Sequence, residues 1–192
     1  MKKHILLFLG VAIALQVSAQ NGLKKGDKAP VFTALDNAGK VLDLKTLLKS
    51  HKAVVLFFYR GQWCPHCNKQ IARLQDSLQL LTGKGAYIIG VTPETGQNIS
   101  KTVDKTHASF SMVGDKDNKI MKAYDVNYTV NPTLFTKLKS YGVDLEKNNG
   151  NGDHILPVPA TYIIDHSGKI IFVHFDKDYT KRPTVSDLLG VL

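Results

Sequence analysis

The chain has few cysteines and no second cysteine pair. Its 192 residues include two cysteines, Cys64 and Cys67, and both belong to one Cys-x-x-Cys motif. A structural zinc site needs about four ligands, so this sequence lacks the donors for a cysteine-rich one. No apolar run reaches the roughly 20 residues that a membrane-spanning helix requires. We therefore expect neither a metal nor a cofactor, and no membrane-embedded body.

Acidic residues are also in short supply. The formal net charge is +9 at pH 7, but the basic residues are spread along the chain and form no arginine-rich run with interleaved aromatics. Such spreading excludes the usual nucleic-acid-binding motifs and favours a solvated basic surface, with which an acidic partner is compatible. The apolar share of 43% is that of an ordinary folded protein.

The first residues have the pattern of a secretory signal. Lys2 and Lys3 precede an apolar run over 5–15, and small residues at 17–19 suit a cleavage site before Gln20. We expect residues 1–19 to be a signal peptide and 20–192 to be one domain exported to the periplasm or the outside, not embedded in the membrane after cleavage. The alternative, a membrane anchor, needs a longer run. Exported proteins normally keep their cysteines paired.

Buried strands alternate with amphipathic helices through the middle of the chain. Apolar runs at 53–59 and 86–91 are typical of strands buried on both faces, and helical spacing follows each of them. This alternation predicts an α/β sheet with parallel crossovers. The expected helices are 44–48, 65–83, 99–107, 120–124 and 185–192, and the expected strands are 29–32, 41–44, 53–59, 86–91, 111–114, 161–164 and 169–175.

Residues 127–157 are the least regular part after the signal segment. We expect one helical turn at 135–138 and a flexible stretch at 148–152. A connection of this length is either the rim of a functional site or a mobile surface loop.

The Cys64/Cys67 pair falls where a strand meets a helix. Pro65 suits the first helical position, which places Cys64 at the N-cap and Cys67 one turn later, within bridging distance. Free backbone amides and the helix dipole favour a thiolate on Cys64, and a protonated His66 would add positive charge. As a structural staple so short a loop contributes only about 2 kcal/mol. Redox chemistry is therefore the favoured interpretation, with His66 alternatively an ordinary solvated residue.

The chain resembles the thioredoxin superfamily and, within it, the AhpC/TSA peroxiredoxin-like branch. The resemblance covers about the whole of 20–192 and implies a thioredoxin-like α/β fold with a central mixed sheet flanked by helices. The matching segments are 26–32 (GDKAPVF), 58–67 (FYRGQWCPHC), 157–162 (PVPATY) and 175–179 with Arg182. The DsbA family also carries Cys-Pro-His-Cys, which implies a rather oxidising Cys64/Cys67 disulfide.

The thioredoxin pattern implies roles for several residues. It is matched at Trp63, Cys64, Cys67 and Pro159, and it makes Pro159 a cis-proline that leaves the backbone of Val158 to pair with an extended substrate. The buried acid of thioredoxins falls on Phe58 here. Proton transfer to or from Cys67 then needs another group, and the candidates are His66, Asp153 and His154.

The peroxiredoxin pattern Pro-x-x-x-Thr-x-x-Cys falls on Arg60, Cys64 and Cys67. It would make Cys67 the peroxidatic cysteine, but the usual proline is Arg60 and the usual threonine is Cys64. The arginine that peroxiredoxins place before the following strand falls on Pro159. These replacements argue against efficient peroxide activation, although Arg60 supplies a cation beside the sulfur.

Three functions follow in order of preference. The first is that of an exported thiol-disulfide oxidoreductase that serves redox homeostasis, exchanging disulfides with a protein client. The second is a thiol-dependent peroxidase, an antioxidant that takes a hydroperoxide and a thioredoxin-like reductant. The third is a peptide-binding module whose disulfide is incidental.

Overall fold

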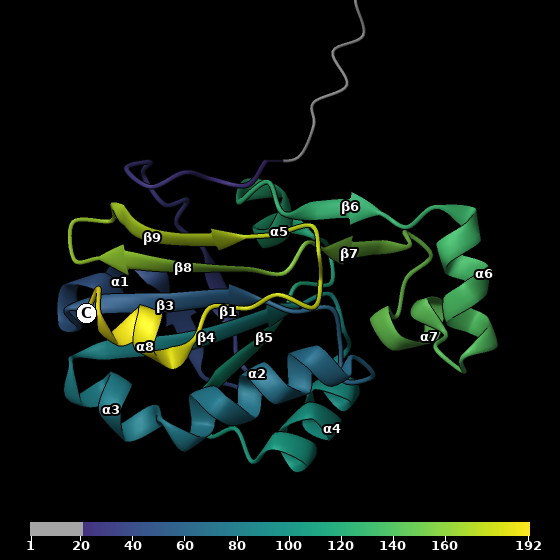
Figure 1. The fold of residues 1–192 in the computed structure, drawn as a ribbon, viewed down its shortest axis with the longest axis horizontal. Coiled ribbons are helices and arrows are strands. Elements are labelled where there is room, and N and C mark those ends of the chain that lie inside the picture. Colours follow the sequence, from purple (N-terminus) through teal and green to yellow (C-terminus); the bar gives the residue numbers. More distant parts are fainter. Residues whose placement is uncertain (1–20) are drawn as a thin grey trace, which may run out of the picture.

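A computed structural model describes residues 21–192, and the expected signal segment 1–19 lies outside the described residues. The fold is built on a 5-stranded mixed sheet in the order β5-β4-β3-β8-β9 (Figure 1). The central strand β3 pairs in parallel with β4 and antiparallel with β8. Its strands are β3 (Ala53–Phe58), β4 (Ala86–Thr92), β5 (Ser111–Gly114), β8 (Ala160–Asp165) and β9 (Ile170–Phe175).

Helices cover both faces of the sheet, because every residue of β3 is apolar and buried. Alternate β3 side chains enter two separate cores, one closed by α2, α3, α4 and α8 and the other by α1 and α5. Figure 1 shows α2, α3 and α4 along one face. The helices are α1 (Leu44–Ser50), α2 (Pro65–Asp76), α3 (Leu78–Gly83), α4 (Gly96–Thr106), α5 (Lys119–Ala123) and α8 (Val185–Leu189). No helix of the described chain has the length and apolar character of a membrane span.

Two local predictions at the ends of these elements are wrong. The helix expected over 65–83 divides into α2 and α3, because Ser77 leaves helical geometry with φ −107° and ψ 12°. The first strand, β1 (Thr33–Leu35), starts later than expected and pairs with β2 (Val41–Asp43). Ala29 lies outside it because its N–H donates to the Gly168 carbonyl in the β8–β9 turn.

Residues 127–157 are more regular than expected. They form β6 (Asn127–Thr129), α6 (Pro132–Ser140), α7 (Leu145–Asn149) and β7 (Ile155–Pro157), at one end of the sheet in Figure 1. Asn131 and Asp144 cap the two helices by accepting backbone N–H bonds. This segment encloses a small apolar core of its own, made of Val130, Leu138, Leu145 and Leu156.

Candidate active site

The loop between β3 and α2 delivers the dithiol to the carboxyl end of the central strand. Cys64 is the N-cap residue of α2 and Pro65 its first helical residue. Gly61 makes the sharp turn that this requires. A Cβ atom on Gly61 would lie 2.6 Å from Glu94 Oε1 and 2.5 Å from Trp63 Nε1, so the loop has room only for glycine there.

The two cysteines are reduced, adjacent and fully buried. The Cys67 thiol donates to Cys64 with 2.6 Å between the sulfur atoms, and neither residue has exposed surface. Their N-cap and one-turn spacing therefore brings both sulfurs to one point. Among residues 21–192, no group of three or more His, Cys, Asp or Glu side chains is placed to hold a metal ion.

Each sulfur has its own guanidinium group. Arg60 Nη2 lies 3.5 Å from Cys64 Sγ, and Arg182 Nη2 lies 3.4 Å from Cys67 Sγ. Arg60 precedes the dithiol in the same loop, whereas Arg182 comes from the segment between β9 and α8. The dithiol is thus held between two permanent cations, which stabilise negative charge on sulfur or on an atom bound to it.

Aromatic rings hold Arg60 over Cys64. The guanidinium carbon lies 3.9 Å from the centre of the Tyr179 ring and 5.0 Å from that of Trp63. Arg60 is only 6% exposed, so these cation–π contacts act where water does not compete. His66 is exposed, and its ring packs against that of Tyr179 in an edge-to-face arrangement with ring centres 5.8 Å apart.

Hydrogen bonds hold Arg182 against Cys67. Its Nε donates to Gln70 Oε1 at 2.7 Å, and its Nη1 donates to the backbone carbonyls of Tyr179 and Lys181. Gln70 is itself fixed, since its Nε2 donates to Thr161 Oγ1 at 3.2 Å. The guanidinium beside Cys67 is therefore oriented by partners from α2 and the β9–α8 segment.

The pKa values of the two thiols diverge. The hydrogen bond from Cys67, with the charge of Arg60, lowers the pKa of Cys64 to about 5, against the opposing effect of burial. Burial, followed by the contact with Cys64, raises the pKa of Cys67. At neutral pH the pair therefore consists of a Cys64 thiolate and a Cys67 thiol, and the nucleophile is Cys64.

A buried carboxyl group lies behind the loop. Glu94 follows β4, and its Oε2 accepts the Gln62 N–H at 2.8 Å while Oε1 has no partner among the described residues. Burial raises the pKa of Glu94 to about 8, so the group is mostly protonated at neutral pH. Glu94 is thus a buried acid held against the loop that carries the dithiol, and its hydrogen bond is to that loop rather than to either sulfur.

The other expected proton carriers are engaged elsewhere. His154 Nε2 pairs with Glu146 at 2.8 Å, and Asp153 accepts a bond from Asn118. Only His66 of the three lies at the dithiol end of α2. The structure therefore does not bring Asp153 or His154 into contact with either sulfur.

Pro159 is not a cis-proline, contrary to the thioredoxin pattern: no peptide bond within 21–192 is cis. The chain stays extended from β7 into β8 because the Val158 N–H donates to the Val126 carbonyl at 2.7 Å. That N–H is then unavailable to an extended substrate. Val158 and Pro159 instead line a cavity of about 400 Å³ together with Arg60, Tyr128 and Tyr179.

Sequence reasoning missed three of the residues that shape the site. The roles of Gln70 and Glu94 were not anticipated, and Arg182 was noticed within a matching segment but given no role. For Glu94 a signal existed, because a polar residue at the carboxyl end of a parallel strand adjoins the site edge of the sheet. For Arg182 no local signal existed, since its contact with Cys67 spans 115 positions.

A family model decides the relationship of the chain. The model described as the AhpC/TSA family matches residues 25–173, most of the chain. The protein belongs to the AhpC/TSA family. The resemblance stated from the sequence is thereby confirmed, and as a family member the protein is an oxidoreductase.

Individual relatives of this AhpC/TSA protein are distant. A putative peroxiredoxin of Mycobacterium tuberculosis is 23% identical over 154 residues, covering 80% of this chain and 86% of that protein. The crystal structure of peroxidoxin BcpB from the same organism superposes with a TM-score of 0.68 at 18% identity, covering 88% of this chain and 96% of the other. A putative thiol:disulfide interchange protein DsbE from Chlorobium tepidum gives 0.52 at 24% identity, covering 80% and 86%. These likenesses confirm the thioredoxin-like fold.

Proposed function

We propose that the protein is a thiol-dependent peroxidase that reduces hydroperoxides through Cys64 and Cys67. The observation that carries the proposal is the pair of guanidinium groups, one against each sulfur at 3.5 and 3.4 Å. Arg60 supplies the cation beside the attacking Cys64 sulfur, and Arg182 supplies one beside Cys67, the residue that the peroxiredoxin pattern would have made the peroxidatic cysteine. The peroxiredoxin relatives support the same function, which the sequence alone ranked second to disulfide exchange.

The chemistry begins at Cys64. Its thiolate attacks the terminal oxygen of the hydroperoxide, so that an S–O bond forms and the O–O bond breaks, which leaves Cys64 as the sulfenic acid. The departing alkoxide or hydroxide takes a proton from water and leaves as an alcohol or as water. Arg60 stabilises the charge that develops on the departing oxygen. The Cys67 thiol then attacks the Cys64 sulfenic acid, releasing water and forming the disulfide. Two electrons from a thiol reductant return both cysteines to the reduced state.

Disulfide exchange is a second candidate, because Cys64 caps a helix and Cys67 follows one turn later, the placement of dithiol oxidoreductases. Against exchange, the Val158 N–H is already bonded to Val126. We therefore rank exchange below peroxide reduction. A peptide-binding module has no separate observation in its favour.

The test is stopped-flow oxidation of the reduced protein by hydrogen peroxide and an alkyl hydroperoxide, followed through the fluorescence of Trp63, the one tryptophan of the chain. We expect Cys64→Ser to abolish the reaction. Cys67→Ser keeps a hydroxyl donor to Cys64, so it should react once, stop at the sulfenic acid and form no intramolecular disulfide.

Arg60→Gln should slow the first step by about a hundredfold, the usual cost of losing one charge-stabilising donor. Lys49→Gln on α1, at the opposite face of the sheet, is the matched control and should react as the wild type does. A wild-type rate no higher than that of a free thiol, with turnover of protein disulfides instead, would overturn the peroxidase in favour of exchange.

Export also belongs to this proposal. The apolar run at 5–15 with Lys2 and Lys3 before it supports cleavage before Gln20 and release into the periplasm or the medium. Fractionation of the host cell, with N-terminal sequencing of the mature protein, tests it.

A further inference from the structure

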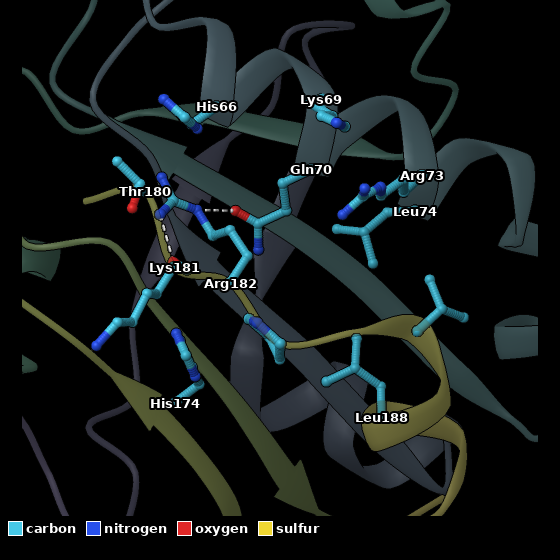
Figure 2. A pocket seen from close by; sticks show the side chains of 12 residues that line it. His66, Lys69, Gln70, Arg73, Leu74, His174, Thr180, Lys181, Arg182 and Leu188 are labelled. Atoms are coloured by element: carbon cyan, nitrogen blue, oxygen red, sulfur yellow. Dashed lines mark hydrogen bonds between the residues drawn. The ribbon is translucent and has the colours of Figure 1, made fainter. Parts of the chain in front are cut away.

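A cavity of about 500 Å³ opens beside the dithiol, between α2 and the β9–α8 segment (Figure 2). We call it the basic pocket. Figure 2 shows residues of α2 on one side and residues of β9 and the following segment on the other. Its polar lining consists chiefly of His66, Lys69, Arg73, His174, Lys181 and Arg182, over apolar side chains that include Leu74 and Leu188.

The charge of this pocket is of one sign. Four of its lining residues are lysine or arginine, and none is aspartate or glutamate. Lys181 pairs with Asp176, but no carboxylate within 21–192 lies at ion-pair distance from Lys69 or Arg73. The pocket thus offers cations to an anion.

The basic pocket is connected to the dithiol through shared residues. Arg182 lines the pocket and also contacts Cys67 Sγ at 3.4 Å, and Gln70 lines the pocket while accepting the Arg182 Nε–H bond. The cavity lined by Pro159, in contrast, adjoins Arg60 on the side of Cys64. The two sulfurs therefore have different neighbouring cavities.

We propose that the basic pocket binds the carboxylate groups of an anionic small-molecule thiol, which reduces the Cys64–Cys67 disulfide. The proposal rests on the peroxidase function for the origin of that disulfide. A cavity of this size suits a small molecule rather than a folded protein reductant. The positive charge of the pocket raises the local concentration of anions. An uncharged hydroperoxide would gain nothing from this charge.

The reaction balances with two thiols. The thiolate of the first attacks Cys67 Sγ, the S–S bond breaks, and Cys64 leaves as a thiolate beside Arg60. A disulfide bond breaks more readily when the departing sulfur is the more stable thiolate, and Cys64 beside Arg60 is that sulfur. A second thiol then attacks the mixed disulfide on Cys67, giving the free small-molecule disulfide and the reduced protein. Two electrons pass from the two small-molecule thiols to the Cys64–Cys67 disulfide, which becomes the dithiol.

The experiment reduces oxidised full-length protein with three thiols of different charge, and follows Trp63 fluorescence. The probes are mercaptosuccinate (two carboxylates), 2-mercaptoethanol (neutral) and cysteamine (cationic), with rates expressed per thiolate. We expect mercaptosuccinate to be faster than 2-mercaptoethanol by about tenfold, with cysteamine slowest, and we expect the preference to fall as salt is added. Succinate, which has no thiol, should compete with mercaptosuccinate.

The variant that tests the site is Lys69→Gln/Arg73→Gln. Both side chains are exposed on α2, so the fold should tolerate the change. We expect the ratio of the mercaptosuccinate rate to the 2-mercaptoethanol rate to fall about threefold, because Lys181 and Arg182 remain in the pocket. Lys45→Gln/Lys49→Gln on α1 removes the same charge away from the pocket and should keep the ratio.

Equal rates for the three thiols, or an anion preference that is undiminished in Lys69→Gln/Arg73→Gln, would overturn the proposal. So would reduction by thioredoxin alone, with all three small thiols inactive. These outcomes differ from failure of the peroxidase, because the disulfide can be formed with any oxidant. A protein that ignores hydroperoxides but still prefers the anionic thiol would lose the peroxidase proposal and keep the basic pocket.

Discussion

At the scale of single residues, Glu94 makes a specific prediction about pH. Burial raises its pKa from 4.5 to about 8, with Lys101 and Lys105 opposing and Cys64 reinforcing the shift. Between these values the folded protein holds a proton that the unfolded chain has released. The contribution of Glu94 to the free energy of unfolding therefore falls as pH rises, by up to about 1.4 kcal/mol per pH unit.

The variant Glu94→Gln keeps the shape and removes the titration. Relative to wild type it should gain stability steadily between pH 4.5 and about 8, as measured by urea unfolding at several pH values. The oxidised protein is the sample to use, because its Cys64 no longer titrates. Asp104→Asn, at an exposed position of α4 with no ion-pair partner within 21–192, is the control. Parallel stability curves for wild type and Glu94→Gln would show that Glu94 ionises normally.

At the scale of elements, Asn98 ties segment 127–157 to α4. Asn98, at 4% exposure, donates through Nδ2 to the Asn148 carbonyl at 3.0 Å, beside the bond from the Thr95 N–H. Asn98→Ala removes one tie between α4 and α7, worth about 1 kcal/mol. We expect faster amide hydrogen exchange in α6 and α7, with the central sheet unchanged. Ser100→Ala on the exposed side of α4 is the control and should leave hydrogen exchange unchanged in α6, in α7 and in the central sheet. Faster exchange throughout the protein in Asn98→Ala would contradict a local tie.

These elements also show where sequence is informative. The apolar run of β3 and the Pro65 start of α2 are local signals, so strand, dithiol and helix were predictable together. The pairing of β6 with β7 joins Asn127 to Pro157 across the intervening helices, and no local pattern encodes it. The caps Asn131 and Asp144 did mark helix starts in that segment, but α6 and α7 are too short for a strong periodic signal.

The residues of the site also differ in whether the local sequence could predict them. Arg60, Cys64 and Cys67 were predictable as a group because eight consecutive positions hold them all. Arg182 lies between the edge strand β9 and α8, and only the tertiary fold brings it to Cys67. Its role could therefore not be predicted from the local sequence. The expected cis-proline failed for a related reason, since the Val158–Val126 bond that keeps this region extended is not local.

At the scale of the whole molecule, the dithiol couples redox state to stability. The pKa of Cys64 is lowered from 9.0 to about 5 in the folded reduced protein, first by the Cys67 hydrogen bond and then by Arg60. The Cys64 thiolate therefore stabilises the folded state, and this stabilisation is fully present above pH 9 and is lost as pH falls through about 5. The oxidised protein has no such titration, and the constraint of its short disulfide loop does not depend on pH.

The free energy of unfolding of the reduced protein, minus that of the oxidised protein, should therefore rise between pH 5 and 9, at up to about 1.4 kcal/mol per pH unit. Glu94 titrates in both forms, so most of its contribution cancels in this difference. Thermal or urea unfolding of both forms across this range measures the slope. Arg60→Gln should narrow the pH range over which this difference in the free energy of unfolding changes, because the pKa of Cys64 is then lowered less. Lys49→Gln should leave that pH range unchanged. A difference that stays constant with pH would mean that the protein does not stabilise the Cys64 thiolate, and the assignment of Cys64 as the nucleophile would fail with it.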